Sequence, residues 1–228
     1  MTVLVVGSRP ESLGSAVQDM LQNKGLKVAT GGVSGEQFFL DVTDGKNVAH
    51  VMNAVRPSQV VCTAGMNESY SLRAEGLMGG IADHFAVNTT GVIRVLQEWL
   101  HMLETTEQGM TPSPKQFVAI SSNSAHIARR QSIAYCASKA ALSMALRCAA
   151  REVAGEGVLV YGYEPGLLAG TPMTAGSADA FPGALHRMPG VKPEGLSTRD
   201  FAATIVVNLT HPNQALHGAM IRLDAGEQ

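Results

Sequence analysis

The 228-residue sequence has almost no excess of charge of either sign. Its 17 Lys and Arg side chains against 19 Asp and Glu give a formal net charge of −2. A chain without a basic surplus has no electrostatic reason to bind nucleic acid or an anionic membrane, so we expect neither as a partner. No apolar stretch reaches the ~20 residues that a membrane span needs. The first residues also lack the basic segment of a signal peptide, so we expect a soluble, cytoplasmic protein.

Cysteine is scarce: the chain has Cys62, Cys136 and Cys148 and no C-x-x-C spacing. An odd number of cysteines in apolar contexts does not predict a disulfide framework, and no metal site is expected. We interpret all three as reduced thiols of a cytosolic protein.

What the sequence does have is an alternation of short β-branched runs with longer segments of helical periodicity. Strands are predicted over residues 3–6, 26–30, 38–40, 59–62, 116–120, 158–161 and 219–223, and helices over 13–24, 48–55, 81–103, 133–152 and 201–209. This alternation is typical of βαβ units, in which parallel strands are covered by helices on both faces. The sequence therefore predicts an α/β fold, a doubly wound parallel sheet in a Rossmann-type three-layer sandwich, as a single domain over residues 1–228.

Two segments interrupt the alternation. Residues 105–114 are polar and contain two prolines, which predicts a surface loop. Residues 166–195 are rich in Gly and Pro and show little periodicity, so we interpret them as an irregular flap that carries substrate specificity.

A glycine-containing turn follows the first predicted strand. In a doubly wound sheet, ligands bind beyond the carboxyl ends of the strands. Here that position holds Gly7-Ser-Arg-Pro-Glu-Ser-Leu-Gly14, and a helix follows. Such a turn lets backbone amides and the positive end of the helix meet a pyrophosphate. The spacing is not G-x-G-x-x-G, so an ordinary strand-to-helix turn is the alternative interpretation.

Tyr135 and Lys139 lie four residues apart on a predicted helix and therefore share one face. An ammonium beside a phenol favours the phenolate and lowers a pKa that is otherwise ~10, which suits acid–base work near neutrality. Ser122 precedes Tyr135 by thirteen residues, just beyond a predicted strand, where it can hydrogen-bond a substrate carbonyl. A surface tyrosine and a solvated lysine are the ordinary alternative, so the pair alone is only suggestive.

With these residues the sequence resembles the short-chain dehydrogenase/reductase family, in its compact main subfamily, over essentially the whole chain. The Tyr-x-x-x-Lys motif of the family is Tyr135-Cys-Ala-Ser-Lys139, its serine is Ser122, and its helix asparagine is Asn88 in Val87-Asn-Thr-Thr-Gly91. The resemblance implies that a dinucleotide carries hydride while Tyr135 transfers the proton and Ser122 orients the carbonyl. Lys139 would lower the Tyr135 pKa and hold the nicotinamide ribose, and Asn88 would position a water that links Lys139 to solvent.

The resemblance also implies a set of cofactor-binding residues at successive strand ends. They are Gly7, Ser8, Arg9, Ser12, Leu13, Gly14, Thr30, Asp41, Val42, Thr63, Ala64, Gly65, Tyr135, Lys139, Pro165, Gly166, Leu168 and Thr171. Three features depart from the family pattern. The glycine turn is one residue longer than usual, Cys62-Thr63 replaces a pair of asparagines, and Thr171 stands one position late.

The expected cofactor is NADP, with NAD as the alternative. Sites for NAD commonly place an acidic residue after the second strand, where it binds the ribose hydroxyls. Here that strand ends at Thr30-Gly31-Gly32, and no acid follows until Glu36. Arg9 in the first turn could pair with a 2′-phosphate, because a guanidinium suits phosphate oxygens; a solvated loop charge is the alternative.

The predicted function is that of an NAD(P)-dependent carbonyl reductase or alcohol dehydrogenase acting on a small molecule. The predicted substrate contacts are Ser122, Ser124, Tyr135 and Leu167, with Met66, His126, Met173, Phe181 and Met188 as further candidates. Arg129 and Arg130 are interpreted as solvated loop charges that could instead attract an acidic substrate.

Other functions stay open at this point. An enoyl reductase or a sugar-nucleotide epimerase is less consistent with the short tyrosine–lysine spacing and the chain length. A catalytically silent dinucleotide-binding sensor or scaffold is kept open by the altered glycine turn. As in many relatives, the helices that carry Asn88 and Tyr135 are expected to pack against symmetry mates, giving a homodimer or homotetramer.

Overall fold

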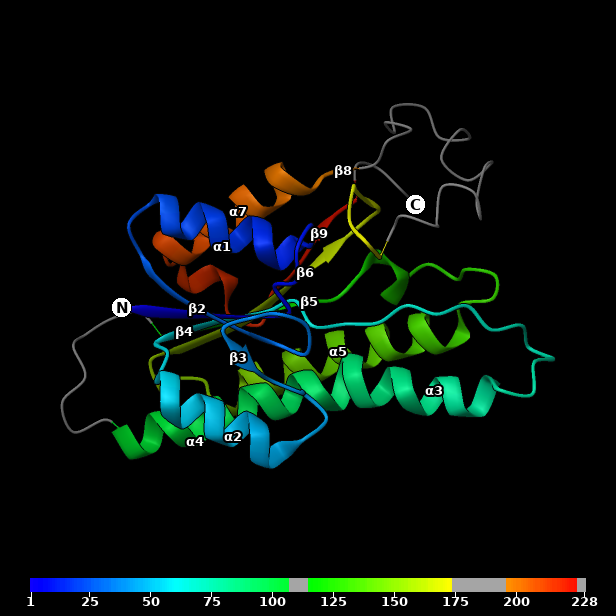
Figure 1. Ribbon diagram of the computed structural model, residues 1–228, viewed down its shortest axis with the longest axis horizontal. Coiled ribbons are helices and arrows are strands. Elements are labelled where there is room, and N and C mark those ends of the chain that lie inside the picture. The colour runs from blue at the N-terminus through cyan, green and yellow to red at the C-terminus, as the bar shows by residue number, and fades with distance from the viewer. Residues whose placement is uncertain (107–114, 174–195, 225–228) are drawn as a thin grey trace.

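The computed structural model describes residues 1–106, 115–173 and 196–224. Its centre is a seven-stranded parallel sheet with the strand order β3-β2-β1-β4-β5-β6-β9 (Figure 1). The strands are β1 (Thr2–Val6), β2 (Lys27–Gly32), β3 (Phe38–Phe39), β4 (Gln59–Cys62), β5 (Lys115–Ile120), β6 (Val158–Pro165) and β9 (Met220–Leu223). A small second sheet pairs β7 (Leu168–Ala169) in parallel with β8 (Leu196–Ser197).

Helices cover both faces of the large sheet. Figure 1 shows α1 (Leu13–Asn23) and α7 (Thr198–Thr210) on one face, with α2 (Gly45–Val55), α4 (Val92–Thr106) and α5 (Ile133–Glu152) on the other. Helix α3 (Leu77–Phe85) packs along α5 and leads through the π-helical turn η1 (Ala86–Gly91) into α4. Short 3-10 turns η2 (Asn123–Ala125) and η4 (Gln214–Leu216) complete the described elements. The predicted doubly wound α/β fold is confirmed.

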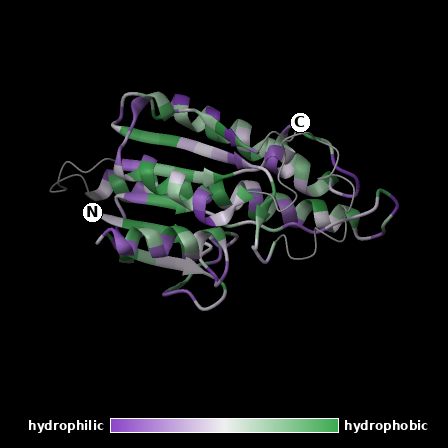
Figure 2. Ribbon diagram, turned by 90° about the horizontal axis from the view of Figure 1, so that it is seen from above, coloured by the Kyte–Doolittle hydropathy of each residue, from purple (hydrophilic) through white to green (hydrophobic). Residues whose placement is uncertain are grey.

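The large sheet divides the apolar interior into two cores, and strand β1 contributes side chains to both. Leu4 and Val6 pack in the cluster under α2, α4 and α5, whereas Val3 and Val5 pack in the cluster under α1 and α7. Successive side chains of a strand point to opposite faces, and all four are buried. This burial on both faces explains why the strands are continuous apolar runs, which stand out in the hydropathy colouring of Figure 2. No helix among the described residues is long and apolar enough to span a membrane.

Three predicted boundaries differ from the structure near the cavity. The single helix predicted over 81–103 begins earlier, at Leu77, and is interrupted by the wider η1 turn. Gly91 in this turn packs closely against Val42, since an added Cβ would lie 2.6 Å from Val42 Cγ2. The strand predicted over 158–161 continues to Pro165, because its last residues pair with β5 on one side and β9 on the other. The second strand likewise continues to Gly32, which pairs with Phe39.

The two interrupting segments are described only in part. Thr105 belongs to α4 rather than to a loop, and residues 107–114 lie outside the described part. Of the flap over 166–195, the structure describes residues 166–173, in which β7 replaces irregular chain. Residues 174–195, and with them the substrate candidates Phe181 and Met188, lie outside the described residues.

Candidate active site

A cavity of about 830 Å³ lies along the carboxyl ends of the central strands. Many of the residues predicted from the sequence line it: Gly7, Arg9, Ser12, Leu13, Asp41, Val42, Thr63, Ala64, Gly65, Ser122, Ser124, Tyr135, Lys139, Pro165, Gly166, Leu167, Leu168 and Thr171. Four others, Ser8, Gly14, Thr30 and Asn88, are buried behind this lining. We call the part around Arg9 and Asp41 the adenosine end, and the part around Ser122 and Tyr135 the reaction end.

The glycine turn closes tightly in spite of its extra residue. Gly7 has a φ of +88°, and a Cβ added to Gly14 would lie 2.4 Å from Gly7 O and 2.7 Å from Thr63 Oγ1. The Thr63 hydroxyl, 2.9 Å from Val6 O and 2.8 Å from Gly7 O, donates to this pair of carbonyls. Thr63, which stands where the family has an asparagine, therefore fastens the end of β4 to the glycine turn.

The turn delivers the chain to the amino end of α1. Ser12 caps this helix by accepting a hydrogen bond from Ser15 N at 3.2 Å. The buried Ser8 hydroxyl has no hydrogen-bond partner among the described residues. Close backbone approach, a helix amino end with its partial positive charge and a spare hydroxyl fit a pyrophosphate, so the residues present suit a dinucleotide.

At the adenosine end, the Glu36 carboxylate lies against Gly32. Glu36 Oε2 accepts a hydrogen bond from Ser34 N at 2.8 Å, and a Cβ added to Gly32 would lie 2.2 Å from Glu36 Oε1. The carboxylate thus occupies the space that a side chain at position 32 would take. Glu36 is the first acid after the second strand, as the sequence shows, and the structure brings it back to the strand end because Gly35, with a φ of +82°, reverses the chain. The sequence signal for the contact between Glu36 and the strand end is the pair of glycines, Gly32 at the end of the strand and Gly35 in the turn.

Asp41 and Val42 are held by neighbouring groups rather than left as free loop. Asp41 Oδ1 accepts hydrogen bonds from Thr43 N at 2.8 Å and from Thr43 Oγ1 at 2.7 Å. Arg94 Nη1 on α4 donates to Val42 O at 2.7 Å. These bonds fix the wall of the cavity that the family resemblance assigns to the adenine.

At the reaction end, Tyr135 stands in the first turn of α5 with only 9% of its surface exposed. Burial raises the pKa of Tyr135 above its ordinary value, while its hydrogen bond with Ser122 and the positive charge of Arg129 act in the opposite direction. The buried His84 ring packs edge-on against Tyr135, with 6.4 Å between ring centroids. The phenol is therefore protonated at neutral pH, and it lines the cavity together with the predicted serine.

Lys139 lies one helical turn further along α5 and is buried. Its Nζ donates to Ile120 O at 2.8 Å and lies 5.8 Å from the centroid of the Tyr135 ring. Burial lowers the pKa of Lys139 to about 8. The Lys139 ammonium thus lies near the Tyr135 ring, and its expected lowering of the Tyr135 pKa stays a prediction.

The Asn88 amide fastens the loop after β4 to α5. Asn88 Oδ1 accepts from Met66 N at 2.8 Å, and Nδ2 lies 3.0 Å from both Met66 O and Ser138 Oγ. These contacts bring Gly65 so close that an added Cβ would lie 3.5 Å from Lys139 Nζ. The amide therefore supports the floor of the reaction end, and the water expected beside Asn88 stays a prediction.

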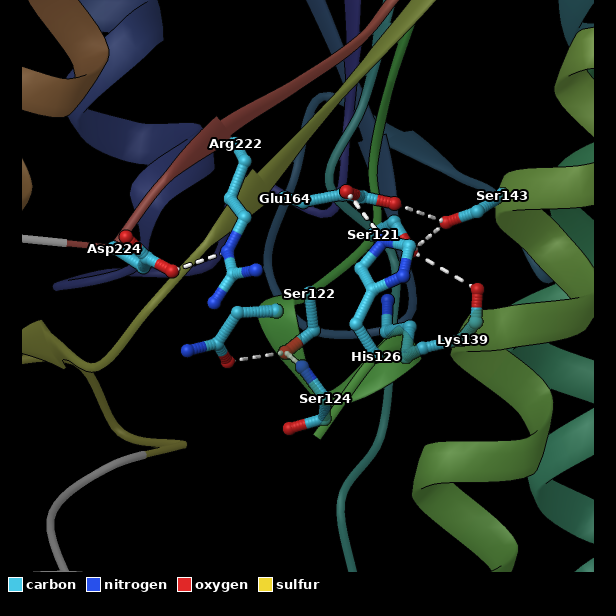
Figure 3. Close-up of polar contacts among 10 residues, drawn as sticks. Ser121, Ser122, Ser124, His126, Lys139, Ser143, Glu164, Arg222 and Asp224 are labelled. Carbon is cyan, nitrogen blue, oxygen red and sulfur yellow. Dashed lines mark hydrogen bonds and ion pairs between the residues drawn. The ribbon is translucent and has the colours of Figure 1, made fainter. Parts of the chain in front are cut away.

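Behind the reaction end, a buried carboxylate on β6 joins α5 to the segment that follows β5. Figure 3 shows Glu164 between Ser143 and His126, with Oε1 accepting from Ser143 Oγ at 2.7 Å and Oε2 lying 2.9 Å from His126 Nε2. Ser121 Oγ lies 2.8 Å from Ser143 Oγ and 3.0 Å from Lys139 O. The interpretation of His126 as a substrate contact is not supported, since it pairs with Glu164 and does not line the cavity.

Arg129 is not a solvated loop charge. Its half-buried side chain lines the cavity, with Nε donating to Ser124 Oγ at 3.0 Å and Nη2 donating to Asn123 Oδ1 at 3.1 Å. Arg130 also lines the cavity but is exposed. The sequence places Arg129 in an irregular loop, where residue spacing does not predict the direction of a side chain.

The described chain after β6 closes the reaction end. Pro165 ends that strand, Leu196 N donates to Leu167 O at 2.8 Å, and the side chains of Leu168 and Thr171 are buried. The pairing of β7 with β8 therefore fixes residues 167–171 beside the cavity.

The parallel sheet, the glycine turn at a helix amino end and the buried Ser–Tyr–Lys set define an NAD(P)-dependent oxidoreductase with a Rossmann-like fold. The chain belongs to the short chain dehydrogenase family, whose pattern it matches over residues 1–180. A search of curated protein sequences finds no match to the chain.

Solved structures with the same fold include proteins bound to either nicotinamide cofactor. One is a 3-oxoacyl-[acyl-carrier protein] reductase from Brucella melitensis in complex with NAD, with 21% identity, a TM-score of 0.86, and coverage of 99% of this chain and 96% of that one. ElxO with NADP bound has 21% identity, a TM-score of 0.82 and coverage of 99% and 98%. A short chain dehydrogenase from Burkholderia cenocepacia J2315 in complex with NADP has 18% identity, a TM-score of 0.75 and coverage of 97% and 87%. At these identities the similarity concerns the fold.

Proposed function

We propose that this protein transfers a hydride between a nicotinamide dinucleotide and a small carbonyl or alcohol substrate, with Tyr135 as the general acid and base. The observation that carries the proposal is the placement of Ser122 and Tyr135, both buried, side by side in the lining of one end of the cavity, with Lys139 one helical turn away. A phenol and a hydroxyl that meet in this way can both hydrogen-bond one substrate oxygen.

When bound, the dinucleotide supplies or accepts the hydride. In the reductive direction, Ser122 donates a hydrogen bond to the carbonyl oxygen and Tyr135 gives that oxygen its proton. In the oxidative direction, Tyr135 takes the proton from the alcohol. Burial keeps the phenol protonated at neutral pH, which favours reduction there, and the bond to Ser122 together with the charge of Arg129 keeps the cost of the phenolate down.

The dinucleotide would lie along the cavity from the glycine turn to Tyr135. The turn over Gly7–Gly14 and the amino end of α1 would hold its pyrophosphate, and Asp41 and Val42 its adenine. Lys139 would hold the nicotinamide ribose. The residues proposed to border the nicotinamide and the nearby ribose are Thr63, Ala64, Gly65, Pro165, Gly166, Leu168 and Thr171.

Two opposite charges compete at the adenosine end. The Glu36 carboxylate beside Gly32 suits the ribose 2′-hydroxyl of NAD and repels a 2′-phosphate, whereas Arg9 favours NADP. Glu36 is half-buried and held by Ser34 N, while Arg9 is exposed. We therefore place NAD ahead of NADP, which reverses the preference drawn from the sequence.

A panel of small ketones, aldehydes and alcohols, assayed with both cofactors at 340 nm, tests the proposal. The expected result is cofactor-dependent turnover of at least one compound pair. The alternative function, a silent dinucleotide-binding sensor or scaffold, requires tight binding of the cofactor without turnover of any compound. Titration of NADH and NADPH fluorescence separates this alternative from a protein that binds no dinucleotide at all.

We also propose a homodimer or homotetramer, formed through the helices around Asn88 and Tyr135. Met78 on α3 and Met144 on α5 expose 69% and 57% of their surfaces, apolar area that a partner helix would cover. Light scattering at micromolar concentration tests the assembly, and a monomeric mass would contradict it.

A further inference from the structure

The charges along the cavity are distributed unevenly. Among its described lining residues, the acidic ones are Glu36 and Asp41, and both lie at the adenosine end. The reaction end instead carries Arg129 and Arg130, together with the neutral polar side chains Asn67, Ser69, Asn123, Ser124 and Ser132. A pocket whose charged side chains all have one sign attracts a ligand of the opposite charge. The reaction end is therefore suited to a polar, negatively charged substrate.

Arg129 is the cation that the structure holds in place. Its Nε and Nη2 donate to Ser124 and Asn123 at 3.0 Å and 3.1 Å, which fixes the plane of the guanidinium. Asn123 Oδ1 accepts from Ser122 Oγ as well, at 3.5 Å. The guanidinium and the hydroxyl that would orient the substrate carbonyl thus lie on either side of one amide oxygen.

The shared acceptor places Arg129 beside the hydroxyl that would orient the substrate carbonyl, and Arg129 lines the same end of the cavity as Tyr135. Its positive charge also acts on the Tyr135 phenol and opposes the rise in pKa that burial causes. The guanidinium therefore lies close to a carbonyl held by Ser122 and Tyr135. A guanidinium presents paired N–H donors that match the two oxygens of a carboxylate.

We propose that Arg129 binds a carboxylate of the substrate, so that the enzyme acts on short-chain oxo acids and the corresponding hydroxy acids. This inference rests on the proposed oxidoreductase function and names its substrate class. In reduction, hydride from the nicotinamide forms the new C–H bond at the carbonyl carbon while Tyr135 gives a proton to the oxygen. The dinucleotide is oxidised, the carbonyl becomes a secondary alcohol, and the carboxylate on Arg129 is unchanged.

Matched acid and ester substrates test the proposal. The probes are 2-oxobutanoate, 3-oxobutanoate and their methyl esters, because each ester keeps the carbonyl and removes the charge. Wild-type protein is expected to favour at least one acid over its ester by about tenfold or more in kcat/KM. Arg129→Gln is expected to slow both substrates, because its charge also acts on Tyr135, and to lower the ratio of kcat/KM for that acid over its ester about tenfold or more.

Two further variants separate binding of the carboxylate from support of the loop. Arg129→Lys keeps the charge but loses the paired donors, so it is expected to restore only part of the preference for the acid. Arg151→Gln removes one exposed arginine from the far end of α5 and is expected to change kcat/KM for neither the acid nor the ester. Equal loss of acid and ester turnover in Arg129→Gln would show a structural role and overturn the proposal, as would loss of the preference in Arg130→Gln alone.

Saturation-transfer NMR with butyrate and with inorganic phosphate gives a readout that does not need turnover. Wild-type protein is expected to bind butyrate, and Arg129→Gln is expected not to. If phosphate binds through Arg129 and butyrate does not bind, the proposal of a carboxylate substrate is overturned, and a phosphate ester becomes the favoured substrate class. If no carbonyl compound is reduced but butyrate still binds through Arg129, the proposed oxidoreductase function fails and the anion site stands. If esters and neutral ketones are reduced and Arg129→Gln changes no ratio, the function stands and the anion site fails.

Discussion

The two ends of the cavity are built differently. At the reaction end, Ser122, Tyr135 and Lys139 expose 7%, 9% and 3% of their surfaces, and Lys139 is hydrogen-bonded to the end of β5. At the adenosine end, the charged groups Arg9 and Glu36 stand on connecting loops, with Arg9 exposed and Glu36 half-buried. The chemistry is therefore held by the sheet and α5, while selection of the cofactor is left to loop side chains.

This difference predicts where substitutions act. A change at the reaction end removes a buried group whose position several elements determine, so its effect on rate or stability is large. A change at the adenosine end alters the charge that one part of the cofactor meets, so it shifts a preference and leaves the reaction itself intact. The predictions below run from the largest expected effect to the smallest.

The first prediction concerns the proton donor. Tyr135→Phe removes only the hydroxyl, so turnover is expected to fall by about a thousandfold, in the range of general acid–base catalysis, while cofactor affinity is nearly unchanged. Steady-state rates and titration of cofactor fluorescence measure the two quantities. Tyr70→Phe is the matched control, because it loses a surface hydrogen bond to Glu68 and keeps its ring against His84. Full activity in Tyr135→Phe would contradict the assignment of the chemistry to the buried groups of the reaction end.

The second prediction concerns the cost of the buried lysine. The pKa of Lys139 is lowered to about 8, so below that pH the folded protein carries a buried charge that the unfolded chain would solvate. Between this value and the ordinary pKa of the unfolded chain, the unfolded state binds more protons, and the stability of the wild type rises with pH. Lys139→Met is expected to be inactive but more stable than wild type at pH 7, by about 3 kcal/mol.

Urea unfolding of wild type and Lys139→Met at pH 7 and pH 10 measures this linkage. The difference in the free energy of unfolding is expected to shrink at the higher pH, because there the wild-type lysine loses its proton on folding. A difference that is the same at both pH values would contradict the assignment of a destabilising charge to Lys139.

The third prediction concerns the adenosine end. Glu36→Gln removes the carboxylate beside Gly32 and is expected to raise the ratio of kcat/KM for NADPH over NADH about tenfold, with little change in kcat. Arg9→Gln is expected to move the same ratio in the opposite direction. Glu156→Gln, an exposed change of the same charge, is the control. An unchanged ratio in both cavity variants would mean that the preference is set elsewhere along the cavity.

The sequence predicts the parts of the fold that depend on local pattern. Helix α5 spans residues 133–152 as predicted, because its start, its alanine-rich body and its end are local features. The strands are visible as apolar runs because side chains such as Val3 and Leu4 are buried on opposite faces of the sheet. The spacing of Ser122, Tyr135 and Lys139 predicts one cluster because strand ends and one helix turn position all three.

The parts that the sequence does not predict depend on contacts between distant segments. Glu36 reaches Gly32 only because the chain reverses at Gly35. Arg129 turns toward Ser124 and Asn123 from an irregular loop, and His126 turns away to pair with Glu164. Asn88 sits in a π-helical turn inside what the periodicity predicts as one continuous helix. In each case the direction of a side chain follows from tertiary packing and not from residue spacing.

Transfer of deuterium from the nicotinamide to the substrate tests the central claim most directly. Wild-type protein and Tyr135→Phe are incubated with cofactor that carries deuterium at C4 of the nicotinamide and with the carbonyl compounds of the panel, and the products are analysed by mass spectrometry. Hydride transfer predicts an alcohol with the deuterium on its carbinol carbon in the wild type and almost none in Tyr135→Phe. Cofactor binding with no labelled alcohol in either protein would contradict the account and favour the silent sensor.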